Sequence, residues 1–265
     1  MACAAGQDPP LTIASFQGTT QQKCWIFTEE RLAEMRRQAN VEAVEAVVRT
    51  QPARLVAEAA DTGAGTVEPS PGKKARTEAG PIDTLTVEED QALQDYYARG
   101  MLKYSADLKL PDSVESTALT YYRRFFLSSS AMDHHPKDVM LTAMWLSCKV
   151  EHYPHRFHDT EKVTLESKRH FKFDTKSFAA LGKVDIDVLL RIERVMLATL
   201  RYHLMVFHPY RPLRGFLAAC ASLSAEQRER LQRKASKYAR EVLRTDAAFV
   251  YAPAEVALHA LKHAA

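Results

Sequence analysis

The chain has 265 residues, of which 46% are hydrophobic and 26% are charged, and its formal net charge is +3. These values are ordinary for a globular protein with one large core or two small ones, and the charge is too small to indicate nucleic-acid binding by itself. The four cysteines are scattered without a close pair, which excludes a disulfide framework or a zinc motif. Reduced thiols are therefore expected, and no apolar run reaches the length of a membrane helix.

The N-terminal part is predicted to be an irregular segment followed by one helix. Residues 1–22 show neither a helical period nor the pattern of a signal peptide, so we expect them to be disordered. An N-terminal helix is expected within residues 23–50. The Thr28 hydroxyl can cap its first free backbone amides, and Gln51-Pro52 is expected to end it.

Residues 51–84 are predicted to be a flexible insertion. They are rich in Ala, Gly, Thr, Glu and Pro and carry no sustained apolar stripe, so they cannot bury enough surface to offset chain entropy. The basic cluster Lys73-Lys74-Ala75-Arg76 lies within this insertion. It is compatible with recognition by the nuclear import machinery, but such clusters also occur by chance.

Residues 85–207 are predicted to form a helical unit around one buried central helix. Thr86 and Glu89 can form a capping box at its start, and Pro136 suits the first turn of the central helix. Asp185 is expected to cap a later helix, and a further helix is expected near 175–182. Two apolar stripes step by four, three and four residues, which places each on one helix face. They are Val114, Ala118, Tyr121 and Phe125, and Val139, Ala143, Leu146 and Val150.

Residues 208–265 repeat this pattern in a shorter form. The preceding FHPYRP at 207–212 interrupts the helical period and marks a joint between two halves. Ser224 and Gln227 can form another capping box, and Pro253 can open a last helix. We count three helices in this half, so the second repeat is expected to be incomplete, with part of its apolar surface exposed.

No catalytic constellation is evident in the sequence. His152, His155 and His158 are spaced three apart, but Pro154 and the neighbouring residues predict a loop, and no carboxylate or thiolate completes a tetrahedral site. We therefore expect no metal. The basic segment Arg228–Arg244 lacks interleaved aromatic residues, so a solvated helix face is favoured over a nucleic-acid interface.

Several motifs, in the same order along the chain, resemble the cyclin box, and their sequences are most similar to those of cyclin H-like members of plants and algae. They are YYRRFFL at 121–127, MDHHPKDVMLT at 132–142, CKVE at 148–151, KCWIFTEE at 23–30, LRYHLMVFHPYRP at 200–212 and LRTDAAFVYAP at 243–253. The resemblance implies an all-α, cyclin-like fold with a first box at 85–207, a truncated second box at 208–265 and an additional N-terminal helix. It does not cover the middle insertion or a loop near 152–178.

The resemblance also implies a kinase-binding site. Lys149 and Glu193 stand where cyclins carry the lysine and glutamate that contact a kinase's regulatory helix. Isolated charges at stripe edges are more often plain surface residues, and only the resemblance reverses this preference. The matching apolar positions around the pair are Leu146, Val150, Leu197 and Leu204. Arg123, where general cyclins often have an acidic residue, agrees with the cyclin H-like group.

By resemblance, the chain is expected to be a nuclear, non-catalytic subunit without a cofactor that activates a cyclin-dependent kinase. The partners implied are the CDK-activating kinase, a RING-finger assembly factor and the transcription factor TFIIH. The alternative is a cyclin-fold promoter-binding factor of the TFIIB type. That alternative requires an N-terminal CxxC zinc ribbon, which the sequence lacks, and a basic DNA-facing second repeat, for which the signal is weak. Direct nucleic-acid binding and membrane association are not expected.

Overall fold

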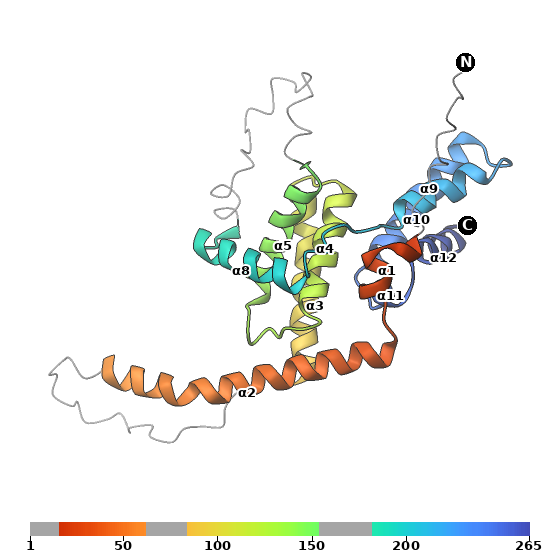
Figure 1. The fold of residues 1–265 in the computed structure, drawn as a ribbon. Helices are drawn as coiled ribbons and strands as arrows, with labels where there is room; N and C mark the ends of the chain where they lie inside the picture. The colour runs from red at the N-terminus through yellow and green to blue at the C-terminus, as the bar shows by residue number, and fades with distance from the viewer. Residues whose placement is uncertain (1–15, 62–83, 154–181) are drawn as a thin grey trace, which may run out of the picture.

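The computed structural model describes residues 16–61, 84–153 and 182–265, and the side chains of all these residues except 51–61. Within these ranges every regular element is a helix, which confirms the predicted all-α class (Figure 1). None of the described helices is both long enough and apolar enough to cross a bilayer. The expected helix near 175–182 (apart from Gly182), the basic cluster at 73–76 and the histidines at 155 and 158 lie outside the described residues.

The N-terminal part contains more structure than we expected. A 3₁₀ turn, Phe16–Gly18, and helix α1, Thr20–Trp25, lie in or overlap the segment predicted to be disordered. Helix α1 is short, and it is held by tertiary contacts of Gln21 and Trp25 that a local sequence pattern does not reveal. Helix α2, Glu29–Asp61, passes beyond Pro52, so the helix end predicted at Gln51-Pro52 is wrong, although an interior proline removes one backbone hydrogen bond and commonly kinks or ends a helix.

The first half is built from α3, Val87–Asp107, α4, Asp112–Phe125, α5, Pro136–Val150, and α8, Ile186–Thr199. Helix α5 packs against α3, α4 and α8, which confirms its central position. The first predicted stripe is fully buried, as is the second except for Val150 at its end. The core also contains large side chains such as Tyr122, Met140 and Met144.

The predicted helix starts of the first half are also present. Thr86 Oγ1 accepts a hydrogen bond from the Glu89 amide at 3.2 Å, and the Glu89 carboxylate accepts one from the Thr86 amide at 2.9 Å. Pro136 opens α5, and Asp185 accepts a hydrogen bond from the Asp187 amide at the start of α8. Local chemistry therefore fixes where these helices begin.

The second half consists of α9, Tyr210–Ala219, α10, Ala225–Val242, the short α11, Ala247–Val250, and α12, Pro253–Ala264. Helices α9, α10 and α12 pack around a separate and smaller core. Most of this core is alanine, which allows close approach of the helix backbones. Ser224 and Gln227 form the predicted capping box.

An extended segment, residues 203–209, joins the two halves (Figure 1). Side chains of the N-terminal part and of α4 hold it in place. Gln21 Oε1 accepts a hydrogen bond from the Phe207 amide at 2.7 Å, and Gln21 Nε2 donates one to the Phe207 carbonyl at 3.2 Å. The guanidinium of buried Arg124 lies 4.6 Å from the Trp25 ring and donates to the His203 carbonyl. The joint is therefore a fixed element of the fold.

Candidate functional site

The structure brings the two charged residues singled out in the sequence into direct contact. Lys149 lies in the last turn of α5 and Glu193 in the middle of α8, 44 positions further along the chain. Because α5 and α8 pack against each other, the Lys149 ammonium forms an ion pair with the Glu193 carboxylate. The same ammonium lies 5.2 Å from the centre of the Trp145 ring, one turn earlier on α5.

The pair lies at the rim of the core rather than inside it. The Lys149 side chain is 40% exposed, whereas the Glu193 side chain is 11% exposed. Lys149 is also favourably placed at the negative end of the α5 dipole. Glu193 is thus held at one fixed position, and the longer lysine remains accessible from outside.

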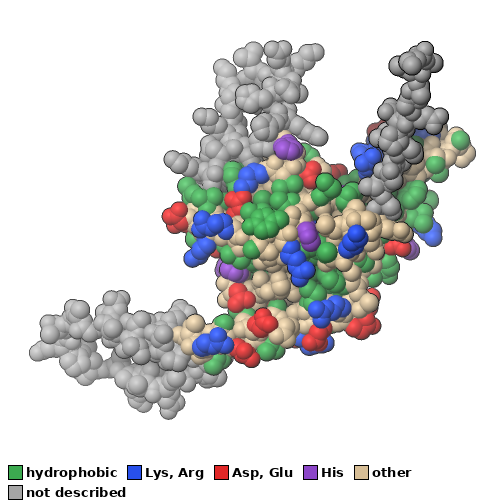
Figure 2. Space-filling model, in the orientation of Figure 1, with side chains coloured by type: hydrophobic (Ala, Val, Ile, Leu, Met, Phe, Trp, Pro, Cys, Tyr) green, Lys and Arg blue, Asp and Glu red, His purple; other side chains and the backbone are tan. Residues whose placement is uncertain are grey.

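The four apolar residues assigned to the site do not have equal exposure. Leu146 is only 3% exposed and belongs to the core, so it packs beneath the surface residues of the site. Val150, Leu197 and Leu204 are partly buried and pack against the same core, leaving part of each side chain in solvent. Over α5 and α8, Figure 2 shows a hydrophobic area with basic and acidic side chains directly beside it.

Leu204 reaches this area because of the turn that ends α8. Arg201 and Tyr202 both have left-handed backbone angles, with φ of 51° and 57°, and the Tyr202 amide donates to the Leu197 carbonyl at 3.0 Å. The Tyr121 hydroxyl then donates to the Leu204 carbonyl at 2.5 Å. This arrangement fixes the chain direction after α8, as a left-handed helix C-cap does in general.

Chemically, this area is suited to binding rather than to reaction. It offers one cation and one anion in fixed positions beside partly exposed aliphatic side chains. Such a surface matches the recognition of an amphipathic helix, in which apolar contacts supply affinity and charges fix direction and register.

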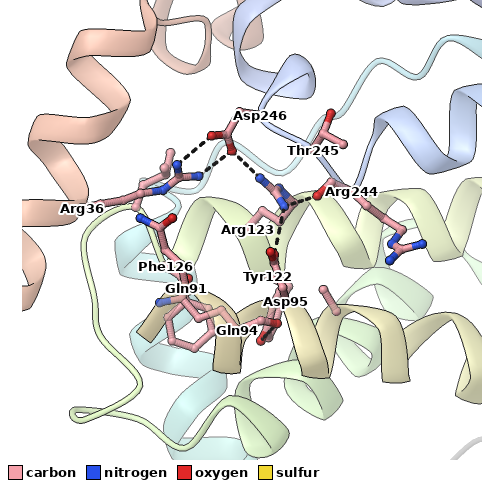
Figure 3. A pocket seen from close by; sticks show the side chains of 12 residues that line it. Arg36, Gln91, Gln94, Asp95, Tyr122, Arg123, Phe126, Arg244, Thr245 and Asp246 are labelled. Carbon is pink, nitrogen blue, oxygen red and sulfur yellow. Dashed lines mark hydrogen bonds and ion pairs between the residues drawn. The ribbon is translucent and has the colours of Figure 1, made fainter. Parts of the chain in front are cut away.

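A second polar cluster connects three parts of the chain (Figure 3). Arg36 of α2 donates two hydrogen bonds to the Asp246 carboxylate, at 2.5 and 2.7 Å. Arg123 of α4 donates to the same carboxylate at 2.6 Å and to the Arg244 carbonyl. Asp246 lies just before α11 in the second half, so one carboxylate ties the N-terminal helix, the first half and the second half together.

The electrostatics of this cluster are those of a structural network. The hydrogen bonds from Arg36 hold the pKa of Asp246 below its ordinary value, and the same contact raises the pKa of Arg36. Burial lowers the pKa of Arg123, whose side chain is only 10% exposed. Sequence reasoning used Arg123 only as a subfamily marker. It missed the network because Arg36, Arg123 and Asp246 share no local motif.

A third set of polar contacts, also missed from the sequence, links the joint to the end of α5. The Thr117 hydroxyl donates to Glu151 at 2.7 Å and lies 2.8 Å from His208 Nε2. Because Thr117 donates its only proton to Glu151, His208 Nε2 must be the donor in the second contact. Burial lowers the pKa of His208 to about 4, so its ring is neutral at physiological pH.

Most arginines of the basic segment 228–244 make hydrogen bonds or ion pairs with other residues of the chain. Arg228 donates to three backbone carbonyls near the end of α9, and Arg240 forms ion pairs with Asp112 and Glu115 of α4. Arg233 and Arg244 form ion pairs with glutamates of the same helical region. These contacts do not support a continuous nucleic-acid face on α10.

The described residues contain no group of three or more His, Cys, Asp or Glu side chains arranged to hold a metal ion. Of the three histidines considered from the sequence, only His152 lies within this part of the chain. It follows the end of α5 and has a left-handed backbone conformation, with φ of 52°.

The fold is that of a helical protein of two halves, and the first half carries the Lys149–Glu193 pair beside partly exposed apolar residues. Two family models match the chain: the cyclin N-terminal domain over residues 84–205 and the cyclin C-terminal domain over residues 208–265. Together they cover more than half of the sequence. The chain therefore belongs to the cyclin family.

Within this family, the chain is similar to cyclins H. It is 27% identical over 259 residues to Cyclin-H1-1 of Arabidopsis thaliana, a match that covers 94% of this chain and 70% of the relative. It is 28% identical over 260 residues to Cyclin-H of Xenopus laevis, with 93% and 67% covered. Cyclin mcs2 of Schizosaccharomyces pombe is 29% identical over 258 residues, with 96% and 70% covered.

Two solved structures share the fold. One is a chain of the CAK complex from Chaetomium thermophilum bound to ATP-gamma-S, with a TM-score of 0.70 and 23% identity, covering 94% of this chain and 68% of that chain. The other is a chain of the yeast TFIIK (Kin28/Ccl1/Tfb3) complex, with a TM-score of 0.65 and 23% identity, covering 93% and 84%. The cyclin-like fold expected from the sequence is thus confirmed.

Proposed function

We propose that this chain is a regulatory cyclin subunit that binds and activates a cyclin-dependent serine/threonine kinase. The observation that carries the proposal is the Lys149–Glu193 pair, which lies beside the partly exposed Val150, Leu197 and Leu204. This surface is complementary to the apolar face of one helix of a partner. Binding would favour the kinase state in which a glutamate of its regulatory helix reaches the lysine of the ATP site.

The partner that we propose is the CDK-activating kinase of TFIIH. Support comes from the similarity to cyclins H and from the two fold relatives, which belong to a CAK complex and to TFIIK. Under this proposal the protein acts in the nucleus, in RNA polymerase II transcription and cell-cycle control. It has no catalytic activity of its own, and a RING-finger assembly factor is a third member of the complex.

Single alanine variants of the pair test this assignment. Lys149→Ala and Glu193→Ala should each weaken kinase binding by about 2–5 kcal/mol, because each truncation leaves a partner group desolvated without its counter-charge. Affinity is measured with purified kinase, and circular dichroism shows whether the fold is kept. Arg233→Ala and Glu229→Ala provide a matched control, since this ion pair is exposed on α10, away from α5 and α8.

The exchange variant Lys149→Glu/Glu193→Lys sharpens the test. It keeps an internal ion pair, so helicity and stability should be retained, but it reverses the two charges presented to the kinase. We expect binding to stay weak in the exchange variant. Wild-type affinity in either alanine variant, with unchanged helicity, would contradict the assigned site, and phosphorylation of peptide by the isolated chain would contradict a purely regulatory role.

A further inference from the structure

The joint between the two halves carries an open apolar groove that is distinct from the α5–α8 site. Its volume is about 710 Å³, and residues of the N-terminal turn, the joint and the starts of α9 and α12 line it. Aromatic and proline side chains dominate the lining: Phe16, Phe207, Tyr210, Pro212 and Pro253. None of the six residues assigned to the α5–α8 site is among them.

The walls of this groove are fixed in the free chain. The Phe207 backbone is held on both sides by Gln21, through the 2.7 and 3.2 Å hydrogen bonds already described. The Phe16 ring meets the Phe207 ring edge to face, with 5.9 Å between the centroids. The Tyr210 hydroxyl lies 2.8 Å from Ser116 Oγ of α4. A ligand entering this groove would therefore not have to order its walls, which lowers the cost of binding.

The charged side chains that line the groove are all basic. Arg211 and Arg214, at the start of α9, line it and are exposed, and no acidic residue is among the lining residues. Neither arginine has an ion pair or a hydrogen bond from its side chain within the described part of the chain. This contrasts with Arg228, Arg240 and Arg244 of the same half, each of which is paired. Two free guanidinium groups thus flank an apolar groove.

We propose that this groove binds a short acidic segment of a partner protein. An aromatic or aliphatic side chain of the segment occupies the apolar groove, and a neighbouring Asp or Glu pairs with Arg211 or Arg214. A polyphosphate chain would use the two cations but would leave the aromatic lining unused. An uncharged apolar peptide would use the lining but would leave both guanidinium groups unpaired. Only an acidic segment with an apolar anchor matches both features.

Selection from a random displayed dodecapeptide library on the full chain tests the proposal and requires no kinase, so its outcome is independent of the proposed function. We expect enriched peptides to place an aromatic or aliphatic residue next to Asp or Glu. A synthetic peptide with the enriched sequence is then titrated against the full chain and its variants. Arg211→Glu/Arg214→Glu should weaken binding by at least about tenfold, and the remaining affinity should be less sensitive to salt.

The matched control is Arg201→Glu/Arg230→Glu, which reverses two exposed arginines outside the groove and should leave peptide affinity unchanged. Phe207→Ala removes part of the apolar wall but keeps the backbone contacts of Gln21, and it should weaken the peptide as well. Thermal unfolding of each variant identifies any loss of fold.

Four results would overturn the proposal. The first is enrichment of peptides without acidic residues. The second is equal affinity for wild type and Arg211→Glu/Arg214→Glu. The third is peptide binding that appears only after deletion of residues 1–15, because the occupant would then be the chain's own N-terminal segment. The fourth is a single-stranded oligonucleotide that binds the groove more tightly than the selected peptide.

Discussion

The two charged clusters of this cyclin differ in how many parts of the fold they join. In the Arg36–Arg123–Asp246 cluster, one carboxylate accepts hydrogen bonds from two arginines, and three separate parts of the fold meet there. In the Lys149–Glu193 pair, two adjacent helices meet at the rim of the core, and the lysine is 40% exposed. The first arrangement is suited to holding the fold together, and the second is suited to meeting a partner. Variants of the Arg36–Arg123–Asp246 cluster should therefore lower stability more than kinase affinity, and variants of the Lys149–Glu193 pair should lower kinase affinity more than stability.

The largest effect on stability is expected from Asp246→Ala. This change leaves Arg36 without its two hydrogen bonds and leaves buried Arg123 with only the Arg244 carbonyl and the more distant Asp95. We expect the free energy of unfolding to fall by about 2–4 kcal/mol, since Asp246 is itself 44% exposed but its removal leaves the nearly buried Arg123 charge without its main counter-charge. Urea denaturation measures the loss. A decrease below about 1 kcal/mol would mean that the cluster does not hold the three parts together.

Asp246 should also contribute to acid sensitivity. Because its folded pKa is below its unfolded value, its stabilising contribution is complete above about pH 4 and is lost as the pH falls through the folded pKa. The stability difference between wild type and Asp246→Asn should therefore shrink below about pH 4. Parallel stability curves for the two proteins across this range would contradict the linkage.

A second effect is expected at milder pH from His208. Its pKa is about 4 in the folded protein and about 6.5 in the unfolded chain, so only the unfolded state gains a proton between these values. Stability should fall by about 2–3 kcal/mol as the pH drops from about 6.5 to 4. In His208→Gln, the amide Nε2 can still donate to Thr117, and this fall should be absent. An unchanged pH dependence in that variant would assign the titration to another group.

A smaller effect is expected from Gln21→Ala, which removes both side-chain hydrogen bonds to the Phe207 backbone. The predicted loss is about 1–2 kcal/mol, because each neutral hydrogen bond contributes about 0.5–1.5 kcal/mol. Hydrogen exchange locates the change. Relative to wild type, we expect the exchange rate of the Phe207 amide to rise more than the rates of the amides in α5. Gln22→Ala, on the same short helix, is the control, since within the described residues its side chain makes no hydrogen bond, and its backbone amide donates to Thr19.

The smallest effect on stability is expected from the pair assigned to the partner. Lys149→Ala should lower the free energy of unfolding less than Asp246→Ala does, because it removes one ion pair, whereas Asp246→Ala removes three hydrogen bonds from two arginines. Denaturation of this variant beside Asp246→Ala tests the comparison directly. A loss in Lys149→Ala as large as that in Asp246→Ala would make the pair a structural contact, and any effect on kinase binding would then be indirect.

Local sequence chemistry predicted much of the first half. The capping box of Thr86 and Glu89, the helix start at Pro136 and the two apolar stripes depend only on residues within a few turns of one another. For the same reason the all-α class could be inferred from spacing alone. The prediction of disorder through residue 22 did not anticipate α1, which depends on contacts of Gln21 and Trp25 with residues more than 170 positions away. Short isolated helices are marginal in water, so no local pattern reveals them.

The sequence by itself therefore determined the class of fold, the helix starts and, through family motifs, the identity of the two rim charges. Only the tertiary structure decided which charges meet. It paired Lys149 with Glu193 and brought Arg36, Arg123 and Asp246 to one point. The physical reason is range. Capping and helical periodicity act over three to seven residues, whereas ion pairs and grooves arise where packing joins segments that are distant in the chain.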